Sequence, residues 1–364
     1  MPRKKRLLLL VGTAKGLFIL ESDSDRKNWN LHPPRLPGWE VGAIHAEIRN
    51  GKPRLVAGTS SWPYGATIRI SEDLGENWTQ VEAGPGFAED SGRKLERFWQ
   101  IAPGHASQPD TLYAGVDQAA LFVSHDAGHT WKENDALANH PTKPGWFPGG
   151  GGMCLHTILQ DPTDAKRMWL GISAVGAFRT DDGGASWKAC NNGLATVPTG
   201  QPPSEVGRCV HKMVLDPDKP GVLYQQFHGG VYTSNDAADS WTPITEGLPS
   251  VFGFPMSVTR NGDLFIVPLQ SDEVRFMRDG RFAVYRSSNR GGTWTAMTSG
   301  LPEKGYHVGV LRDATSVDTH DDAGIYVGTT MGDLWHSRDG GTNWQQIPGK
   351  FPRIMMVRAW EIEG

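Results

Sequence analysis

The stretch Thr180-Asp181-Asp182-Gly183-Gly184-Ala185-Ser186-Trp187 has the composition of a tight turn between two β-strands. The carboxylate of Asp182 can accept hydrogen bonds from the backbone of its own turn, and Gly183 and Gly184 tolerate a positive φ angle. Trp187 then offers a large apolar ring to a hydrophobic core. The stretch therefore predicts a strand–turn–strand unit that ends in a buried tryptophan.

The same eight-residue pattern occurs seven times along the chain. Each copy has polar residues at its first and third positions and Trp at its eighth, and the first copy is degenerate because Ser24 and Arg26 replace the usual aspartate and glycine. The copies span residues 22–29, 71–78, 124–131, 180–187, 234–241, 287–294 and 337–344, so that their tryptophans lie 49 to 56 residues apart. A regular period in this range is typical of propellers and solenoids.

Each period has the pattern of four short strands. In residues 154–190, alternating apolar residues bounded by Gly, Pro and Asp predict strands at 154–159, 167–172, 177–180 and from 187 to 190. Four antiparallel strands per period form one propeller blade. Seven copies of the turn therefore predict seven blades.

The two ends of the chain together supply the strands of one blade. Residues 9–12 align with the second strand of the other periods, so the first period lacks its innermost strand. Residues 354–362 follow the last repeat and can provide that strand, which leaves no exposed sheet edge. The predicted fold class is all-β, a seven-bladed β-propeller of four-stranded blades, with the ring closed by the C-terminal strand. Residues 1–364 are expected to form a single domain.

The repeated frame Ser-x-Asp-x-Gly-x-Thr/Asn-Trp resembles the Asp-box, or BNR repeat, of sialidase-like and photosystem-assembly-factor-like propellers, and the resemblance covers nearly the whole chain. It implies a propeller in which each box is a structural turn at the outer edge of its blade. The aspartates of the boxes, such as Asp182, are therefore poor catalytic candidates. The function stays open, because Asp-box propellers include hydrolases, lyases, receptors and assembly factors.

Charge and cysteine content restrict the partners and the compartment. With 36 Lys and Arg against 40 Asp and Glu, the net charge of −4 gives no reason to expect nucleic acid or an anionic membrane as a partner. Cys154, Cys190 and Cys209 cannot all pair and lack zinc-knuckle spacing, which favours a reduced, cytoplasmic location. The apolar run 7–11 is too short for a signal peptide, and we expect a mature strand there. No stretch approaches the length of a transmembrane helix.

Histidines at matching positions predict a metal site at the axis. Counting back from the second strand of each blade places a polar residue at one level of the central channel in four consecutive blades, and a neighbouring loop adds one more: His45, Gln100, His156, His211 and the loop residue His228. Neutral imidazoles are good ligands for a divalent transition metal such as Mn, Zn, Fe or Cu, and an amide oxygen can complete the set. The arrangement is similar to the three-His-one-Gln manganese site of oligogalacturonate lyase and to the four-His iron of propeller oxygenases. The alternative is that these side chains hydrogen-bond one another and trapped water.

Other residues near the same channel mouth could bind a substrate. Arg97 and Arg208 suit an anionic group, Trp99 can stack on a sugar ring, and Glu205 adds a carboxylate. We expect an enzyme, a hydrolase or lyase acting on a carbohydrate-like or other small polar molecule, with its catalytic residues still unidentified. The alternative is a non-catalytic scaffold that binds a protein partner on its loop face. Sialidase activity is not expected, because the N-terminal Phe/Tyr-Arg-Ile-Pro signature is missing and sialidases usually have six blades.

Overall fold

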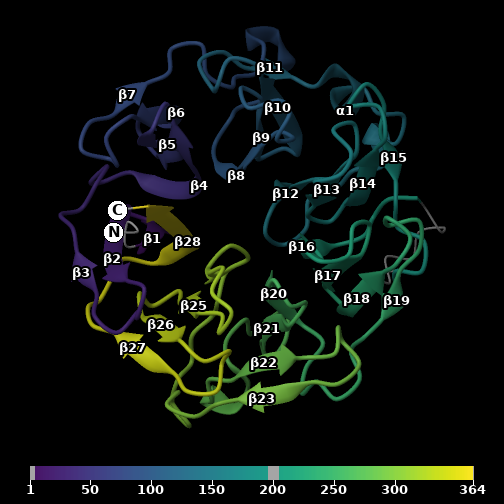
Figure 1. Cartoon of the computed structure of the whole chain (residues 1–364). Coiled ribbons are helices and arrows are strands. Elements are labelled where there is room, and N and C mark those ends of the chain that lie inside the picture. The colour runs from purple at the N-terminus through teal and green to yellow at the C-terminus, as the bar shows by residue number, and fades with distance from the viewer. Residues whose placement is uncertain (1–4, 196–204, 364) are drawn as a thin grey trace.

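The computed structural model describes residues 5–195 and 205–363. These residues form seven four-stranded antiparallel sheets around one axis, which confirms the predicted seven-bladed propeller (Figure 1). In each sheet the first strand lies nearest the axis and the fourth lies at the outer edge. In these two ranges, no helix is both long enough and apolar enough to cross a membrane.

The blades follow one another around the ring in chain order. The blade that contains both chain ends consists of β28 (Ile354–Glu363), β1 (Lys5–Thr13), β2 (Gly16–Asp23) and β3 (Asn30–Leu31). The next three blades consist of β4 (Glu40–Arg49), β5 (Lys52–Ser61), β6 (Gly65–Ser71) and β7 (Thr79–Gln80); β8 (Phe98–Pro103), β9 (Leu112–Val116), β10 (Ala120–Ser124) and β11 (Lys132–Glu133); and β12 (Leu155–Gln160), β13 (Met168–Ile172), β14 (Gly176–Thr180) and β15 (Lys188–Ala189). The last three consist of β16 (Val210–Leu215), β17 (Leu223–Phe227), β18 (Gly230–Ser234) and β19 (Thr242–Pro243); β20 (Gly253–Val258), β21 (Leu264–Pro268), β22 (Val284–Ser287) and β23 (Thr295–Met297); and β24 (Thr315–Val317), β25 (Ile325–Gly328), β26 (Leu334–Ser337) and β27 (Gln345–Ile347). The connections carry α1 (Asp135–Ala138) and 3-10 turns at Glu89–Ser91, Lys143–Gly145 and Arg278–Gly280.

The ring is closed by pairing between the two ends of the described chain. β28 runs antiparallel to β1, with Leu9 opposite Ala359 and Val11 opposite Val357. Figure 1 shows the two chain ends side by side at this blade. The apolar run 7–11 is buried within β1, as expected for a strand that packs against blades on both sides. Closure by the C-terminal strand therefore confirms the prediction and removes the free sheet edge that an open ring would expose.

The repeated turn has the same hydrogen bonds in the copies after the first. In residues 71–78, the Ser71 hydroxyl donates to Asp73 and accepts the Gly75 N–H, while Asp73 accepts the N–H of Asn77. The turns at 124–131, 180–187, 234–241, 287–294 and 337–344 repeat this arrangement. In the first copy the Ser22 hydroxyl is buried without a hydrogen-bond partner, which agrees with its degenerate sequence.

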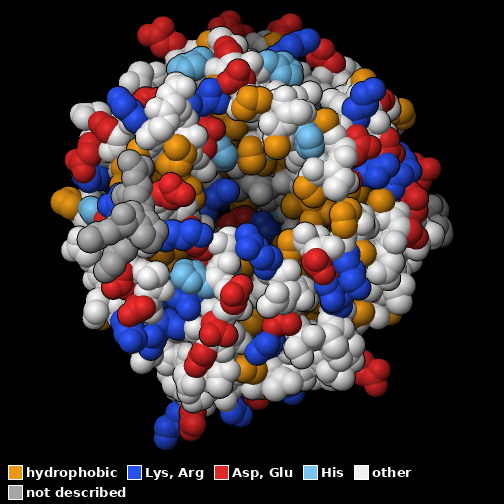
Figure 2. Space-filling view, in the orientation of Figure 1, with side chains coloured by type: hydrophobic (Ala, Val, Ile, Leu, Met, Phe, Trp, Pro, Cys, Tyr) orange, Lys and Arg blue, Asp and Glu red, His pale blue; other side chains and the backbone are white. Residues whose placement is uncertain are grey.

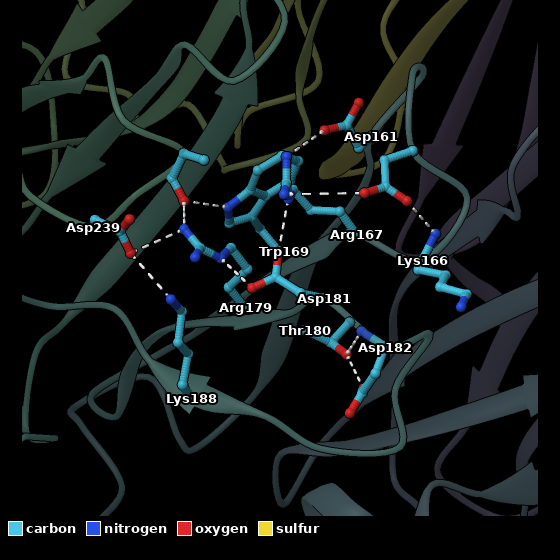
Figure 3. A network of polar contacts seen from close by, with 12 residues as sticks. Asp161, Lys166, Arg167, Trp169, Arg179, Thr180, Asp181, Asp182, Lys188 and Asp239 are labelled. Carbon is cyan, nitrogen blue, oxygen red and sulfur yellow. Dashed lines mark hydrogen bonds and ion pairs between the residues drawn. The ribbon is translucent and has the colours of Figure 1, made fainter.

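Charged side chains tie neighbouring blades together beside these turns (Figure 3). Arg167 and Arg179 both bind Asp181, at 2.7 and 3.0 Å. Arg179 also reaches Asp239 of the next blade at 3.0 Å, where Lys188 is the second cation at 3.1 Å. An isolated surface ion pair contributes little to stability, but shared partners reduce the entropic cost of each further pair. The charged groups of this network are therefore paired with one another within the protein.

Candidate functional site

A large cavity opens at the axis of the ring. Its volume is about 1320 Å³, and residues from all seven blades line it. These residues come from the beginnings of the innermost strands, from the loops that precede them and from the loops between the second and third strands. Figure 2 shows one face of the disc, where the surface is hollowed at the axis and charged side chains gather around the hollow. A concave site of this size is the default position for a ligand.

The cavity brings together part of the predicted site. Arg97, Trp99 and Arg208 line it, together with His211 and His228. The remaining predicted residues are absent from the lining: His45, Gln100, His156 and Glu205. Glu205 is exposed instead, and its backbone carbonyl accepts a hydrogen bond from the side chain of Asn191.

The predicted level of the axial residues needs correction. Gln100 lies opposite the glycine of its second strand, but in β12 it is Thr157, and not His156, that holds this position. The reason is that the connection between β8 and β9 is one residue longer than the connection between β12 and β13. His156 and His211 are equivalent to each other at a β-bulge, and Trp99 occupies the matching position in β8.

His45 lies deeper in its strand than the spacing predicts. The glycine position of β5, Gly58, faces Ala43, so His45 is two residues further along β4. Ala43 lies 15 residues before Gly58, the same spacing that separates Gln100 from Gly115, so His45 could share this level only if the turn shortened the register by two residues, and that assumption was wrong. His45 is buried beside Glu47, with 3.7 Å between Nε2 and Oε2, and burial lowers the pKa of its imidazole.

His156 and Gln100 are used in contacts between neighbouring blades. Nδ1 of His156 lies 3.0 Å from the hydroxyl of Thr157, and Nε2 lies 2.9 Å from the carbonyl oxygen of Val210. Complete burial lowers the pKa of His156 well below its usual value, so the ring is neutral. The side-chain oxygen of Gln100 accepts the N–H of Ile158. Both side chains therefore hydrogen-bond the protein around them, although their partners are backbone groups and a hydroxyl, and not one another as the alternative supposed.

A cluster that the sequence analysis did not assemble lies at the cavity wall: Cys209 joins His211 and His228. One possible ligand atom from each residue lies within 4.8 Å of the other two. Sγ of Cys209 is 3.5 Å from Nε2 of His211, and Nδ1 of His211 is 2.6 Å from the carbonyl oxygen of Gly253. We call this group the Cys–His cluster. Its sequence signal was Cys209-x-His211, two potential metal ligands close together where a strand begins.

Electrostatic coupling within the Cys–His cluster favours separated charges. Burial by itself would raise the pKa of the Cys209 thiol, but the contacts with His211 and His228 outweigh it and lower the pKa to about 5. The contact with Cys209 raises the pKa of His228, whereas burial lowers the pKa of His211. Nε2 of His228 also lies 3.4 Å from a carboxylate oxygen of Asp272. The two imidazoles therefore favour the ionised form of the Cys209 thiol.

The cavity has an excess of positive charge. Its two lining carboxylates are already paired, Glu40 with Arg97 at 2.6 Å and Asp313 with Lys212. The other arginines of the lining have no carboxylate partner among the described residues: Arg208, Arg275, Arg312 and Arg353. Unpaired guanidinium groups around a concave, partly desolvated site attract anions.

Aromatic rings hold some of these guanidinium groups in place. Arg312 lies 5.2 Å from the ring centres of both Trp99 and Phe254, and its guanidinium donates to the Ser173 hydroxyl at 3.3 Å. Arg275 lies 5.8 Å from Phe254. Such contacts are attractive and restrict the side chain without neutralising its charge.

The fold and the site thus define a seven-bladed propeller with a basic axial cavity and a Cys–His cluster in its wall. No family model matches the chain. It is 26% identical over 164 residues to an oligoxyloglucan-reducing end-specific xyloglucanase of Emericella nidulans, covering 40% of this chain and 19% of that protein. It is 25% identical over 272 residues to a xyloglucanase of Paenibacillus sp, covering 66% and 25%. The chain therefore spans about a fifth to a quarter of the length of these relatives.

Solved structures share the fold. An ancestral GH74 enzyme superposes with a TM-score of 0.59 at 17% identity, covering 85% of this chain and 39% of that one. YCF48 bound to D1 peptide superposes with a TM-score of 0.52 at 14% identity, covering 82% of both chains. At these identities the likeness concerns the propeller architecture alone.

Proposed function

We propose that the axial cavity binds a small anionic, carbohydrate-like molecule and that this chain acts on it as a hydrolase or lyase. The observation that carries the proposal is the set of four arginines without carboxylate partners in the cavity lining. A guanidinium group presents paired donors that match a carboxylate or a phosphate. A ligand that supplies this anion would neutralise the excess positive charge of the cavity.

The carbohydrate part of the proposal is supported by the aromatic lining and by the relatives. Trp99, Phe147 and Phe254 present rings to the cavity, and rings combined with a few oriented polar groups are typical of small-molecule sites. The relatives named above are xyloglucanases, enzymes that act on a carbohydrate. The basic lining leads us to propose an acidic sugar, and not a neutral glycan, as the ligand of this cavity.

The reaction is not assigned to a pair of carboxylates. Most glycoside hydrolases use one carboxyl group as an acid and another as a base or nucleophile. The carboxylates of this lining, Glu40 and Asp313, are both held in ion pairs with cations. We therefore propose a reaction in which positive charge stabilises a developing anion, as proton abstraction beside a carboxylate would require.

Calorimetric titration of the full chain with three matched ligands tests the binding. Galacturonic acid, galactose 1-phosphate and galactose share a sugar ring and differ in charge. We expect an acidic ligand to bind at least about tenfold more tightly than galactose, because a hydrogen bond to a charged group contributes roughly 1.5–3 kcal/mol. The two acids separate a carboxylate preference from a phosphate preference. Equal affinity for all three, or no binding of either acid, would contradict the proposal.

A second function, binding of a protein partner on the loop face, is favoured by exposed aromatic side chains. Trp62 is 97% exposed, Tyr64 is 75% exposed and Phe147 is 69% exposed, and all three lie in loops. The structural neighbour YCF48 was solved in complex with the D1 peptide. A scaffold of this kind would bind its partner through Trp62 and Tyr64 and would be insensitive to the loss of cavity arginines. Pull-down with wild type and with Trp62→Ala separates the two functions.

A further inference from the structure

We propose that Cys209, His211 and His228 bind one Zn²⁺ ion and leave a coordination position open toward the axial cavity. Binding of the ion does not require the anionic ligand proposed above, so the two proposals can fail separately. The site differs from the metal set expected from the sequence, of which it keeps His211 and His228 and to which it adds a thiolate.

The backbone places the three side chains before any ion binds. Cys209 directly precedes β16, and His211 is the extra residue of the β-bulge at the start of that strand. The bulge brings the His211 ring to 3.5 Å from the sulfur of Cys209. His228 follows β17, the strand paired with β16, and its N–H donates to the carbonyl oxygen of Cys209 at 3.0 Å. All three ligands therefore come from one hairpin, and their approach does not depend on how separate blades pack.

The distances suit a tetrahedral ion. With Zn–S near 2.3 Å and Zn–N near 2.0–2.1 Å, tetrahedral angles place the sulfur and nitrogen ligands about 3.5 Å apart. Sγ of Cys209 lies 3.5 Å from Nε2 of His211. The third ligand atom, from His228, lies within 4.8 Å of both, so a small rotation of a half-exposed side chain completes the set.

Outer contacts orient both imidazoles. The carbonyl oxygen of Gly253 can only accept a hydrogen bond, so Nδ1 of His211 carries the proton and Nε2 directs its lone pair toward Cys209. Asp272 lies 3.4 Å from Nε2 of His228 and supplies the carboxylate that often accompanies a metal-binding histidine. The ring of Phe254 lies 4.8 Å from the ring of His211 and covers this side of the cluster.

The ligand chemistry selects the ion. A thiolate with two imidazoles suits Zn²⁺, whereas Mn²⁺ prefers oxygen ligands. Three protein ligands and one open position are the arrangement of catalytic zinc sites, where the fourth ligand is water or substrate. Because the three residues line the cavity, that position faces the space in which we place the substrate.

A reactive thiolate without metal is the competing interpretation. Cys209, His228 and Asp272 have the order of a nucleophile, a base and an orienting carboxylate. A nucleophile needs one base, however, and the second imidazole, His211, is held with its free nitrogen directed at the sulfur. Convergence of two oriented imidazoles on one thiolate favours a metal ion.

Zinc titration of the metal-free full chain, in competition with a chromophoric chelator, tests the site. We expect one ion per chain and a loss of affinity greater than about 100-fold in Cys209→Ser and in His228→Ala, since loss of an outer-shell partner alone costs about 10–100-fold. Asp272→Asn should fall in that smaller range. Cys190→Ser and His125→Ala are matched controls outside the cluster and should bind zinc like the wild type. Co²⁺ should give the absorption of a thiolate-bound, four-coordinate ion that Cys209→Ser lacks.

Thermal melting of each variant separates a lost ligand from a lost fold. Absence of zinc binding by the folded wild type would overturn the proposal, and so would an unchanged affinity in folded Cys209→Ser. Alkylation with iodoacetamide decides between the interpretations. Protection of Cys209 by Zn²⁺ supports the metal site, whereas rapid alkylation that Zn²⁺ does not slow would assign the thiolate to nucleophilic chemistry instead.

Discussion

Polar groups at the outer edge of the propeller and polar groups at its axis differ in whether they have partners within the protein. At the edge, Asp182 accepts hydrogen bonds from Thr180 and Ser186, and Arg179 is shared between two aspartates. At the axis, Arg312 touches aromatic rings and one hydroxyl and has no carboxylate partner among the described residues. The charged groups of the edge network are paired within the protein, whereas several arginines at the axis have no carboxylate partner among the described residues and can bind a ligand.

This difference separates structural polar groups from functional ones. Buried polar groups that lack hydrogen-bond partners are rare in folded proteins, because each one lowers the free energy of unfolding. Groups that persist without protein partners, and groups whose pKa values are strongly perturbed in a cavity, are therefore candidates for ligand binding. By this criterion the aspartates of the repeated turns have a structural role, and the unpaired arginines of the axial cavity and the Cys–His cluster are candidates for ligand binding.

The largest expected effect comes from removing the strand that closes the ring. Deletion of residues 354–364 removes β28, exposes the edge of β1 and opens the core between two blades. We expect no cooperative melting transition, as followed by circular dichroism. Deletion of residues 363–364 alone removes the last pairing with Lys5 and should leave melting nearly unchanged. A long deletion that melts within a few degrees of the full chain would show that the ring does not need this closure.

A core tryptophan of the edge should have the next largest effect. Trp187 is 7% exposed, and its indole N–H donates to the side-chain oxygen of Asn134 at 3.0 Å. Trp187→Ala should lower the free energy of unfolding by about 3–5 kcal/mol, the range for truncating a large buried aromatic residue. The matched control is Trp62→Ala, which removes a 97% exposed ring and should change stability by less than about 0.5 kcal/mol.

Denaturant unfolding measures the free energy of unfolding of both variants, and calorimetry measures ligand and zinc binding by the folded fraction. If the repeated turns have only a structural role, folded Trp187→Ala should bind zinc and ligand as the wild type does. If Trp187→Ala were stable but failed to bind, the edge would have a functional role and the separation of edge and axis would be wrong.

The same contrast explains which features the sequence could predict. Each repeated turn is fixed by hydrogen bonds among eight consecutive residues, such as those from Ser71 to Asn77, so its pattern is readable locally and gives the fold. The axial site depends on register between strands, where one extra residue in a connection moved Gln100 away from the level of His156. Cys209 was missed because its partner His228 is brought to it by strand pairing and not by a fixed spacing.

An axial arginine should affect binding more than stability. Arg312→Gln keeps a polar side chain near Ser173 but removes the charge between Trp99 and Phe254. We expect the affinity for the acidic ligand to fall by about 10- to 100-fold, the equivalent of one charge-assisted hydrogen bond. The matched edge variant Arg179→Gln loses its contacts with aspartates and should keep the affinity of the wild type. Calorimetry that finds equal losses in both variants would contradict the distinction between edge and axis.

The smallest expected effect concerns Glu47, a partly buried carboxylate of the innermost strand β4 that is paired with Arg49 and Arg54. Burial would raise the pKa of Glu47, but the nearby imidazole of His45 and hydrogen bonds from Arg49 and Arg54 outweigh it and lower the pKa from 4.5 to about 2. Because the folded pKa is the lower one, the ionised carboxylate stabilises the fold above about pH 4.5, and this contribution is lost as the pH falls toward 2.

Urea unfolding of the wild type and of Glu47→Gln at several pH values measures this contribution. We expect the wild type to be more stable by about 1 kcal/mol at pH 7, after allowance for solvent screening, and the difference to vanish near pH 2. Arg54, which is 1% exposed, keeps its contacts with Glu72 and with the carbonyl oxygen of Ala127 in the variant, so the fold should persist. Zinc and ligand binding should be unchanged at pH 7, because Glu47 is paired within the protein and is expected to stabilise the fold without contacting a ligand. A stability difference that grows as the pH falls would contradict the lowered pKa of Glu47. A loss of zinc or ligand binding would show that a residue near the axis can have a functional role even when its charge is paired.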